Sequence, residues 1–291
     1  MTLSRFEYLA PETVEEACML LKKKGDKAAV MAGGTDLLIK IRHHLSRPDV
    51  IIGLKKIRGL DRISFDKKQG LTIGASALLS DVASHPYILK KYPAIAYAAQ
   101  ETATVQIRNM GTVGGNLCNA APSADNAPTL IAMNAEISLV GPKGQRQLPL
   151  DQFFIAPGLT VMEEGEVLTS IFVPLPPPSS GVVYKHISAR GKVDISAVGI
   201  GTMLIMNGDI CNDARIVLGA VAPVPMRALK TEKLIKGKKL TRRLAERAGI
   251  QASKESSPIT DARATAEYRR SMVAVLTKRA LIEAGKRGIK K

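Results

Sequence analysis

Apolar and polar positions in the first hundred residues follow helical and strand periods in quick succession. Residues 11–25, PETVEEACMLLKKKG, carry apolar side chains at helical spacing, with acidic residues near the start and three lysines before Gly25, as a helix dipole favours. This pattern predicts a helix that ends at Gly25. The next segments predict, in order, a strand, a glycine turn with a helix, two short strands and a mostly helical stretch: 27–32, 33–45, 50–54, 70–80 and 81–103.

The pattern changes at a proline-rich segment after a further helix and hairpin, which residues 127–154 predict. Four of the five residues from Pro174 to Pro178 are proline, and such a run cannot continue a helix or a central strand. Beyond this linker, residues 182–222 alternate strand and turn signals as an antiparallel sheet does, and two amphipathic helices follow at 241–255 and 265–287. We therefore expect an α+β protein with two domains.

Length and composition agree with a globular protein of this organisation. The chain has 291 residues, 45% of them hydrophobic, which is enough for two packed cores. It contains no run of about 18 uncharged apolar residues, and its N-terminus lacks the basic start and apolar core of a signal peptide. The three cysteines are far apart and odd in number, so neither a disulfide framework nor a metal site is indicated. We expect no membrane span and a cytoplasmic location.

The formal net charge of +16 is concentrated near the C-terminus. From Met226 to Lys291 there are 19 Lys and Arg against 6 Asp and Glu, a net charge of +13. A solvated helical surface, a docking surface for an acidic partner and a nucleic-acid site are all open interpretations. The single aromatic residue of this stretch, Tyr268, argues against nucleic acid.

Two glycine-rich segments stand out as candidate binding loops. One is VMAGGTDLLIK at 30–40, and the other is IRNMGTVGGNLCNAAPSADNAP at 107–128. Glycine lets a ligand approach the main chain, and successive amides present partial positive charge, which suits a diphosphate. Neither segment has the spacing of a Walker loop or of a Rossmann dinucleotide site. A plain turn is the alternative for each loop taken alone.

The two loops together resemble those of the FAD-binding subunit of the molybdenum hydroxylases, the xanthine dehydrogenase and carbon monoxide dehydrogenase family. The similarity extends along the chain, through DQFFIAPGLT, EVLTSIFVP and RGKVDISAVGIG to VLGAVAPVPMRA. The resemblance implies an FAD-binding domain of the PCMH type over residues 1–175, built from two α/β subdomains at about 1–57 and 58–175. A C-terminal domain of antiparallel sheet plus helices would occupy residues 181–291.

The resemblance also implies which residues bind FAD. The pyrophosphate loops would comprise Ala32, Gly33, Gly34, Thr35, Asp36, Leu37, Thr112, Gly114, Gly115 and Asn116. Asp125 would bind the sugar or ribityl region, and Leu168 and Lys185 would lie beside the ring system. Each side chain has a structural alternative: Asp36 and Asp125 as helix N-caps, Leu168 as core, and Lys185 as a surface cation.

By the same resemblance the chain is an electron-transfer subunit. A large subunit with a molybdenum cofactor and a small 2Fe–2S subunit would be its partners, in a heterotrimer or its dimer, and an external acceptor would take the electrons. The residues themselves show no acid/base pair, activated nucleophile or metal cluster, so we expect no catalytic or metal-binding residues. Cys118 is expected to pack its loop, and His43 and His44 to lie on the surface. The alternative function is a self-contained FAD-dependent oxidoreductase with its own substrate pocket.

Overall fold

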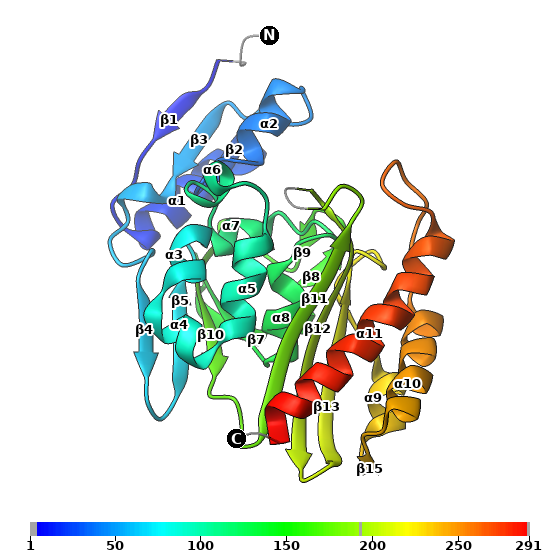
Figure 1. Ribbon diagram of the computed structural model, residues 1–291. Coiled ribbons are helices and arrows are strands. Elements are labelled where there is room, and N and C mark those ends of the chain that lie inside the picture. Colours follow the sequence, from blue (N-terminus) through cyan, green and yellow to red (C-terminus); the bar gives the residue numbers. More distant parts are fainter. Residues whose placement is uncertain (1–4, 192–193, 290–291) are drawn as a thin grey trace.

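The computed structural model describes residues 5–191 and 194–289, in which helices and three main sheets are arranged side by side (Figure 1). The first sheet is parallel, in the order β1–β3–β2, and packs against α1. Thr13 begins α1 by accepting a hydrogen bond from the Glu16 amide, and Gly25 ends it at a φ of 54°. The elements of this part are β1 (Glu7–Leu9), α1 (Val14–Lys24), η1 (Gly25–Lys27), β2 (Ala28–Met31), α2 (Leu37–Arg42), β3 (Val50–Gly53) and η2 (Leu54–Lys56).

The second sheet is antiparallel, in the order β4–β5–β10–β6–β7, and the main hydrophobic core lies between it and helices α3, α5 and α8. Its strands are β4 (Ile63–Asp66), β5 (Gly70–Gly74), β6 (Glu136–Gly141), β7 (Gly144–Pro149) and β10 (Val167–Pro174). The remaining elements are α3 (Leu79–Ser84), α4 (Pro86–Lys91), α5 (Pro93–Glu101), α6 (Val105–Arg108), α7 (Val113–Cys118), α8 (Asn126–Ala132), η3 (Leu150–Gln152), β8 (Phe154–Ala156) and β9 (Leu159–Thr160).

The third sheet is also antiparallel, in the order β11–β12–β13–β14, with β15 paired to β13. Helix α11 covers one face of it, and α10 packs against α11 (Figure 1). The elements are β11 (Ser180–Ser188), β12 (Ser196–Asn207), β13 (Ile210–Gly219), β14 (Met226–Arg227), α9 (Leu229–Ile235), β15 (Lys238–Lys239), α10 (Arg242–Glu255) and α11 (Ala266–Ile289). None of the described helices is long and apolar enough to cross a membrane.

Helices α5 and α8 are sandwiched between the second and third sheets (Figure 1). The approach of β12 to α8 is close enough to require glycine, because a Cβ at Gly201 would lie 2.2 Å from the Pro128 carbonyl oxygen. Met203 and Val217 from the third sheet extend the core of the second. The two sheets are thus packed through a shared hydrophobic layer.

The periodicity predicted the α+β class and most of the long elements, and the structure confirms them. Helices α1 and α10 lie within the predicted segments, α11 extends two residues beyond its predicted end, and a hairpin joins β12 to β13 at Gly208. The short strands β1 and β4 were missed, because neither has a strand pattern of its own. β1 is stabilised by pairing with the distant β3, and β4 by pairing with the adjacent β5. The second glycine segment begins in the short helix α6, contains α7 and ends in α8.

Candidate functional site

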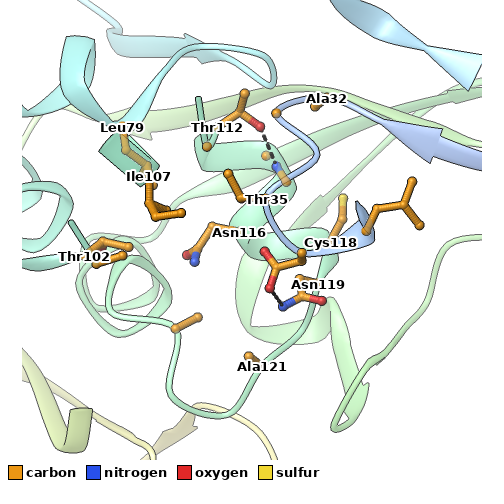
Figure 2. Close-up of a pocket in the computed structure, with 18 of the residues that line it drawn as sticks. Ala32, Thr35, Leu79, Thr102, Ile107, Thr112, Asn116, Cys118, Asn119 and Ala121 are labelled. Carbon is orange, nitrogen blue, oxygen red and sulfur yellow. Dashed lines mark hydrogen bonds between the residues drawn. The ribbon is translucent and has the colours of Figure 1, made fainter. Parts of the chain in front are cut away.

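A cavity of about 1070 Å³ lies where the first sheet, the second sheet and the start of the third meet. Its wall combines the loop after β2, helix α7, the start of β10 and the loop between β11 and β12. Figure 2 shows Thr35, Thr112, Asn116 and Asn119 arranged around this space. All of the residues predicted to bind FAD, apart from Lys185, line the cavity.

The first glycine loop packs directly on the second. A Cβ at Gly33 would lie 2.0 Å from the Met110 carbonyl oxygen, so only glycine fits there. Gly34 has a φ of 74°, which also favours glycine. Within the described hydrogen bonds, none is donated by the main-chain amides from Gly33 to Asp36. This loop therefore lines the cavity with free N–H donors, which is what an anionic group needs.

The second glycine loop is different, because its amides are already used inside the protein. The amide of Gly114 donates to the Ala75 carbonyl, that of Gly115 to the Thr112 hydroxyl, and that of Asn116 to the Thr112 carbonyl. A Cβ at Gly114 would lie 2.5 Å from the Ala75 oxygen. Its glycine is thus explained by close packing of α7 on the end of β5, whereas the sequence analysis expected both loops to offer bare amides.

Polar side chains connect the two loops around the cavity. Asn119 donates to Asp36 at 3.0 Å and accepts from the Lys40 ammonium at 2.7 Å (Figure 2). Asp36 occupies the N-cap position of α2 but makes no capping hydrogen bond with its side chain. Asn116 accepts from Asn126 at 3.1 Å. The hydroxyl of Thr35 has no hydrogen bond within the described chain and remains available to a ligand.

Asp125 is the most deeply buried carboxylate of the cavity wall, with 7% of its surface exposed. It stands at the N-cap position of α8, yet its side chain makes no capping bond. One carboxylate oxygen, Oδ1, instead accepts from the Tyr184 hydroxyl and from the Ser196 hydroxyl, each at 2.6 Å. Burial raises the pKa of Asp125, and the two hydroxyl donors oppose that shift. The N-cap alternative does not describe this side chain.

The other predicted positions differ in outcome. Leu168 lines the cavity and is also part of the main core. Lys185 lies on β11 outside the cavity wall, and its ammonium pairs with Glu283 on α11 at 2.6 Å.

Cys118 lines the cavity, and burial raises the pKa of its thiol to about 12, so it stays a neutral thiol at neutral pH. His43 and His44 are exposed, as expected.

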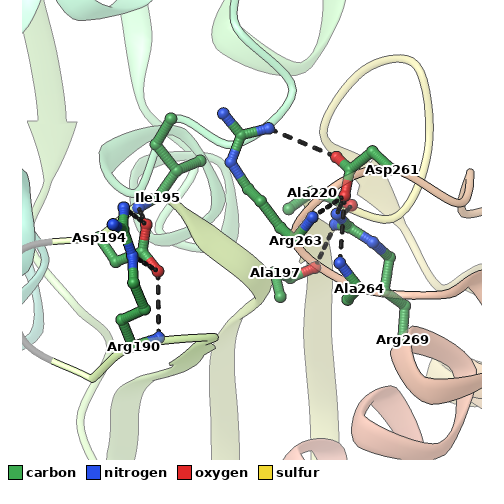
Figure 3. A network of polar contacts seen from close by, with 9 residues as sticks. All are labelled: Arg190, Asp194, Ile195, Ala197, Ala220, Asp261, Arg263, Ala264 and Arg269. Carbon is green, nitrogen blue, oxygen red and sulfur yellow. Dashed lines mark hydrogen bonds and ion pairs between the residues drawn. The ribbon is translucent and has the colours of Figure 1, made fainter.

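The C-terminal part supplies one edge of the cavity through the loop between β11 and β12 and the loop before α11 (Figure 3). Arg190 pairs with Asp194 at 3.2 Å, and Ile195 follows. Arg263 also lines this edge. Its main-chain amide donates a hydrogen bond to Asp261, which also accepts one from Arg269 at 2.7 Å. Figure 3 shows that the Arg190–Asp194 pair and the group around Asp261 come from different segments of the C-terminal part. None of these residues was among those predicted to bind FAD.

These features fit a dinucleotide. The volume exceeds the roughly 300–1,000 Å³ of common small-molecule sites, the free amides of the first loop suit a diphosphate, and Asp125 provides a buried acceptor for a hydroxyl. Apolar side chains such as Leu168 and Met162 offer surface to a flat ring.

Comparison with known proteins decides the family. Residues 4–176 match the family model described as the FAD binding domain in molybdopterin dehydrogenase, and residues 183–284 match the CO dehydrogenase flavoprotein C-terminal domain. The chain belongs to the FAD-binding subunits of the molybdopterin dehydrogenases. Members of this family are oxidoreductase subunits that work within molybdenum-dependent dehydrogenases.

Relatives of this family cover the chain almost end to end. The carbon monoxide dehydrogenase medium chain of Hydrogenophaga pseudoflava is 33% identical over 279 residues, covering 95% of this chain and 96% of the relative. The glyceraldehyde dehydrogenase medium chain of Sulfolobus acidocaldarius is 31% identical, covering 96% and 98%. A solved carbon monoxide dehydrogenase of Hydrogenophaga pseudoflava superposes with a TM-score of 0.95 at 33% identity, and 99% of each chain is covered. The resemblance inferred from the two glycine loops is confirmed.

Proposed function

We propose that the cavity binds one FAD, with its diphosphate on the free amides of residues 33–36 and a sugar or ribityl hydroxyl on Asp125. The residues of this site are those of both loops together with Leu168. The unused amides carry this proposal, because they donate no described hydrogen bond, whereas the amides of residues 114–116 are bonded within the chain. Lys185 receives no role at the cofactor, since it faces Glu283.

In the assembled complex, bound FAD would supply electron transfer between the iron–sulfur clusters of the small partner subunit and an external acceptor. What this chain contributes is binding and orientation. The first loop would hold the diphosphate, α7 positions Asn116 in the cavity wall, and the buried Asp125 would fix the hydroxyl-bearing part of the cofactor. No His or Tyr lines the described cavity wall, so no observation favours a self-contained oxidoreductase.

We propose two domains, residues 1–175 and 181–291, which the two family models and the linker before β11 support. The cytoplasm is the proposed location, because all three cysteines are free and a reducing compartment keeps them so. We propose that the molybdenum subunit sets the substrate of the complex.

Replacement of Thr35 by Val tests the placement of FAD. Valine keeps the shape of threonine and removes the unpartnered hydroxyl, so FAD affinity should fall by roughly fivefold, or about 1 kcal/mol. Absorbance and fluorescence titration of the apoprotein with FAD measures it.

Thr72 on β5 provides the matched control, because it is half-buried and lies outside the cavity wall. Thr72→Val should leave the affinity unchanged. Equal FAD affinity in wild type and Thr35→Val would remove Thr35 from the site, and a purified chain without flavin absorbance that fails to take up FAD would refute the proposal as a whole.

A further inference from the structure

A line of hydrogen bonds leads from the cavity to the molecular surface across the boundary between the second and third sheets. Asp125 accepts from Ser196 at 2.6 Å, Ser196 lies 3.2 Å from Nδ1 of His186, and Nε2 of His186 lies 3.2 Å from Glu101. Asp125 and Ser196 are buried, whereas the side chains of His186 and Glu101 are 15% and 23% exposed. The line therefore begins at the cavity wall and ends at solvent.

Hydrogen positions along this line can be assigned in two ways that keep every bond. In the first, Asp125 is ionised, Ser196 donates to it, Nδ1–H of His186 donates to Ser196, and Nε2–H donates to Glu101. In the second, a protonated Asp125 donates to Ser196, and Ser196 donates to a bare Nδ1. The two arrangements hold the same number of protons and differ only in which end carries one.

We propose that Asp125, Ser196, His186 and Glu101 form a proton path from solvent into the cavity. In the forward step the Nδ1–H bond of His186 breaks as an O–H bond forms on Ser196. The original Ser196 O–H bond breaks as one forms on Asp125 Oδ1. No electrons are transferred. His186 is left neutral, and its Nε2–H still donates a hydrogen bond to Glu101. Solvent restores the proton at the His186–Glu101 end.

The surroundings favour both ends of this path. Burial raises the pKa of Asp125, so its carboxyl can hold a proton in the cavity wall. The ring of Tyr184 stacks on His186 at a centroid distance of 5.7 Å, and Tyr97 from α5 packs against it at 6.4 Å. Lys185 and Glu283, which neutralise each other on β11 and α11, are the neighbouring charged pair.

The path rests on the proposed FAD site, because flavin reduction takes up protons as well as electrons, and a ligand that fills the cavity leaves it little water. Asp125 is the carboxylate that connects this cavity to the path. The path would supply protons at the cavity wall.

Two substitutions that remove donors to the same Asp125 oxygen distinguish a proton path from a role in FAD binding alone. Ser196→Ala and Tyr184→Phe each remove a hydroxyl that donates to Asp125 Oδ1 at 2.6 Å, but only the first interrupts the path. The FAD-loaded chain is photoreduced rapidly, and a pH-indicator dye follows proton uptake from solvent. We expect Ser196→Ala to slow proton uptake at least about tenfold relative to flavin bleaching, and Tyr184→Phe to keep the two in step.

His186→Gln gives a second interruption at a residue that does not line the cavity, so it remains informative if Ser196→Ala loses FAD. It should delay proton uptake in the same way. Proton uptake that keeps pace with bleaching in both variants, or an equal delay in Tyr184→Phe, would overturn the path. Because the test uses flavin already bound, such a result leaves the FAD site intact, whereas a chain without flavin would count against the site itself.

Discussion

At the scale of single residues, the cavity depends on a few side chains whose partners come from elsewhere in the chain. Asp125 is held by Tyr184 and Ser196, and Asp36 by Asn119. Both aspartates stand at helix N-cap positions, and neither uses its side chain to cap. Their carboxylates are instead fixed toward the cavity, where a cofactor hydroxyl or a neighbouring amide can reach them.

Asp125→Asn should change how stability depends on pH. Folding raises the pKa of Asp125 above its unfolded value of about 3.9. At pH values between the unfolded and folded pKa, the folded protein therefore binds more protons than the unfolded chain. The unfolding free energy consequently falls as pH rises through this window. Asparagine does not titrate, so the stability of wild type relative to the variant should decrease across that window. Urea denaturation of the apoprotein at several pH values measures this difference, and a difference that rises with pH would contradict the assignment.

At the scale of elements, Arg269 connects α11 to the sheet that it covers. Arg269 is 3% exposed, and its guanidinium donates to the carbonyls of Ala197 and Ala220 and to Asp261 (Figure 3). The Arg263 amide and then Arg269 hold the pKa of Asp261 down, to about 2. This arrangement fixes the loop before α11 at the edge of the cavity.

Arg269→Met should lower the unfolding free energy by about 1–3 kcal/mol, because it leaves two buried carbonyls without donors. Since the folded pKa of Asp261 is depressed, its contribution is present above the unfolded value and is lost as pH falls from about 4 toward about 2. Thermal denaturation of wild type and variant across this range measures both effects. Arg270→Met, at an exposed neighbour, is the control and should change stability little; equal effects of the two substitutions would refute the role of Arg269.

At the scale of the whole molecule, the chain contains a cofactor site and no substrate site of its own that the described residues reveal. Its positive charge is concentrated in the C-terminal quarter, where Arg242, Arg243 and Arg247 are exposed on α10. Charge of this kind sets the rate and orientation of encounter with an acidic surface. Members of the family to which this chain belongs are subunits of multi-subunit dehydrogenases.

The isolated chain should therefore be a competent flavoprotein without substrate oxidation. Chemical reduction should bleach its flavin and an acceptor should restore it, while purines and aldehydes leave it oxidised. Absorbance of the partner-free chain checks this, with the co-purified complex as the positive control. Assembly should slow as salt is raised if α10 meets an acidic partner. Stoichiometric flavin reduction by such a substrate in the chain alone would instead indicate a self-contained enzyme.

The α+β order, the long helices and the two glycine loops could be predicted from the amino-acid sequence, because these features depend on residues close together in the chain. Helix α1 could be predicted to its Gly25 end, and the loops carried enough of the family pattern to indicate FAD. Such features arise from local periodicity, capping and turn chemistry.

Which main-chain and side-chain groups of the loops are available to a ligand depends on how the chain packs in three dimensions. The amides of 33–36 are free, whereas that of Gly114 is bonded to the Ala75 carbonyl because α7 packs on the end of β5. The partners of Asp125 lie 59 and 71 residues away, and Lys185 is turned to Glu283 by the packing of α11 on β11. These outcomes depend on contacts between distant segments, and no pattern within either segment specifies them.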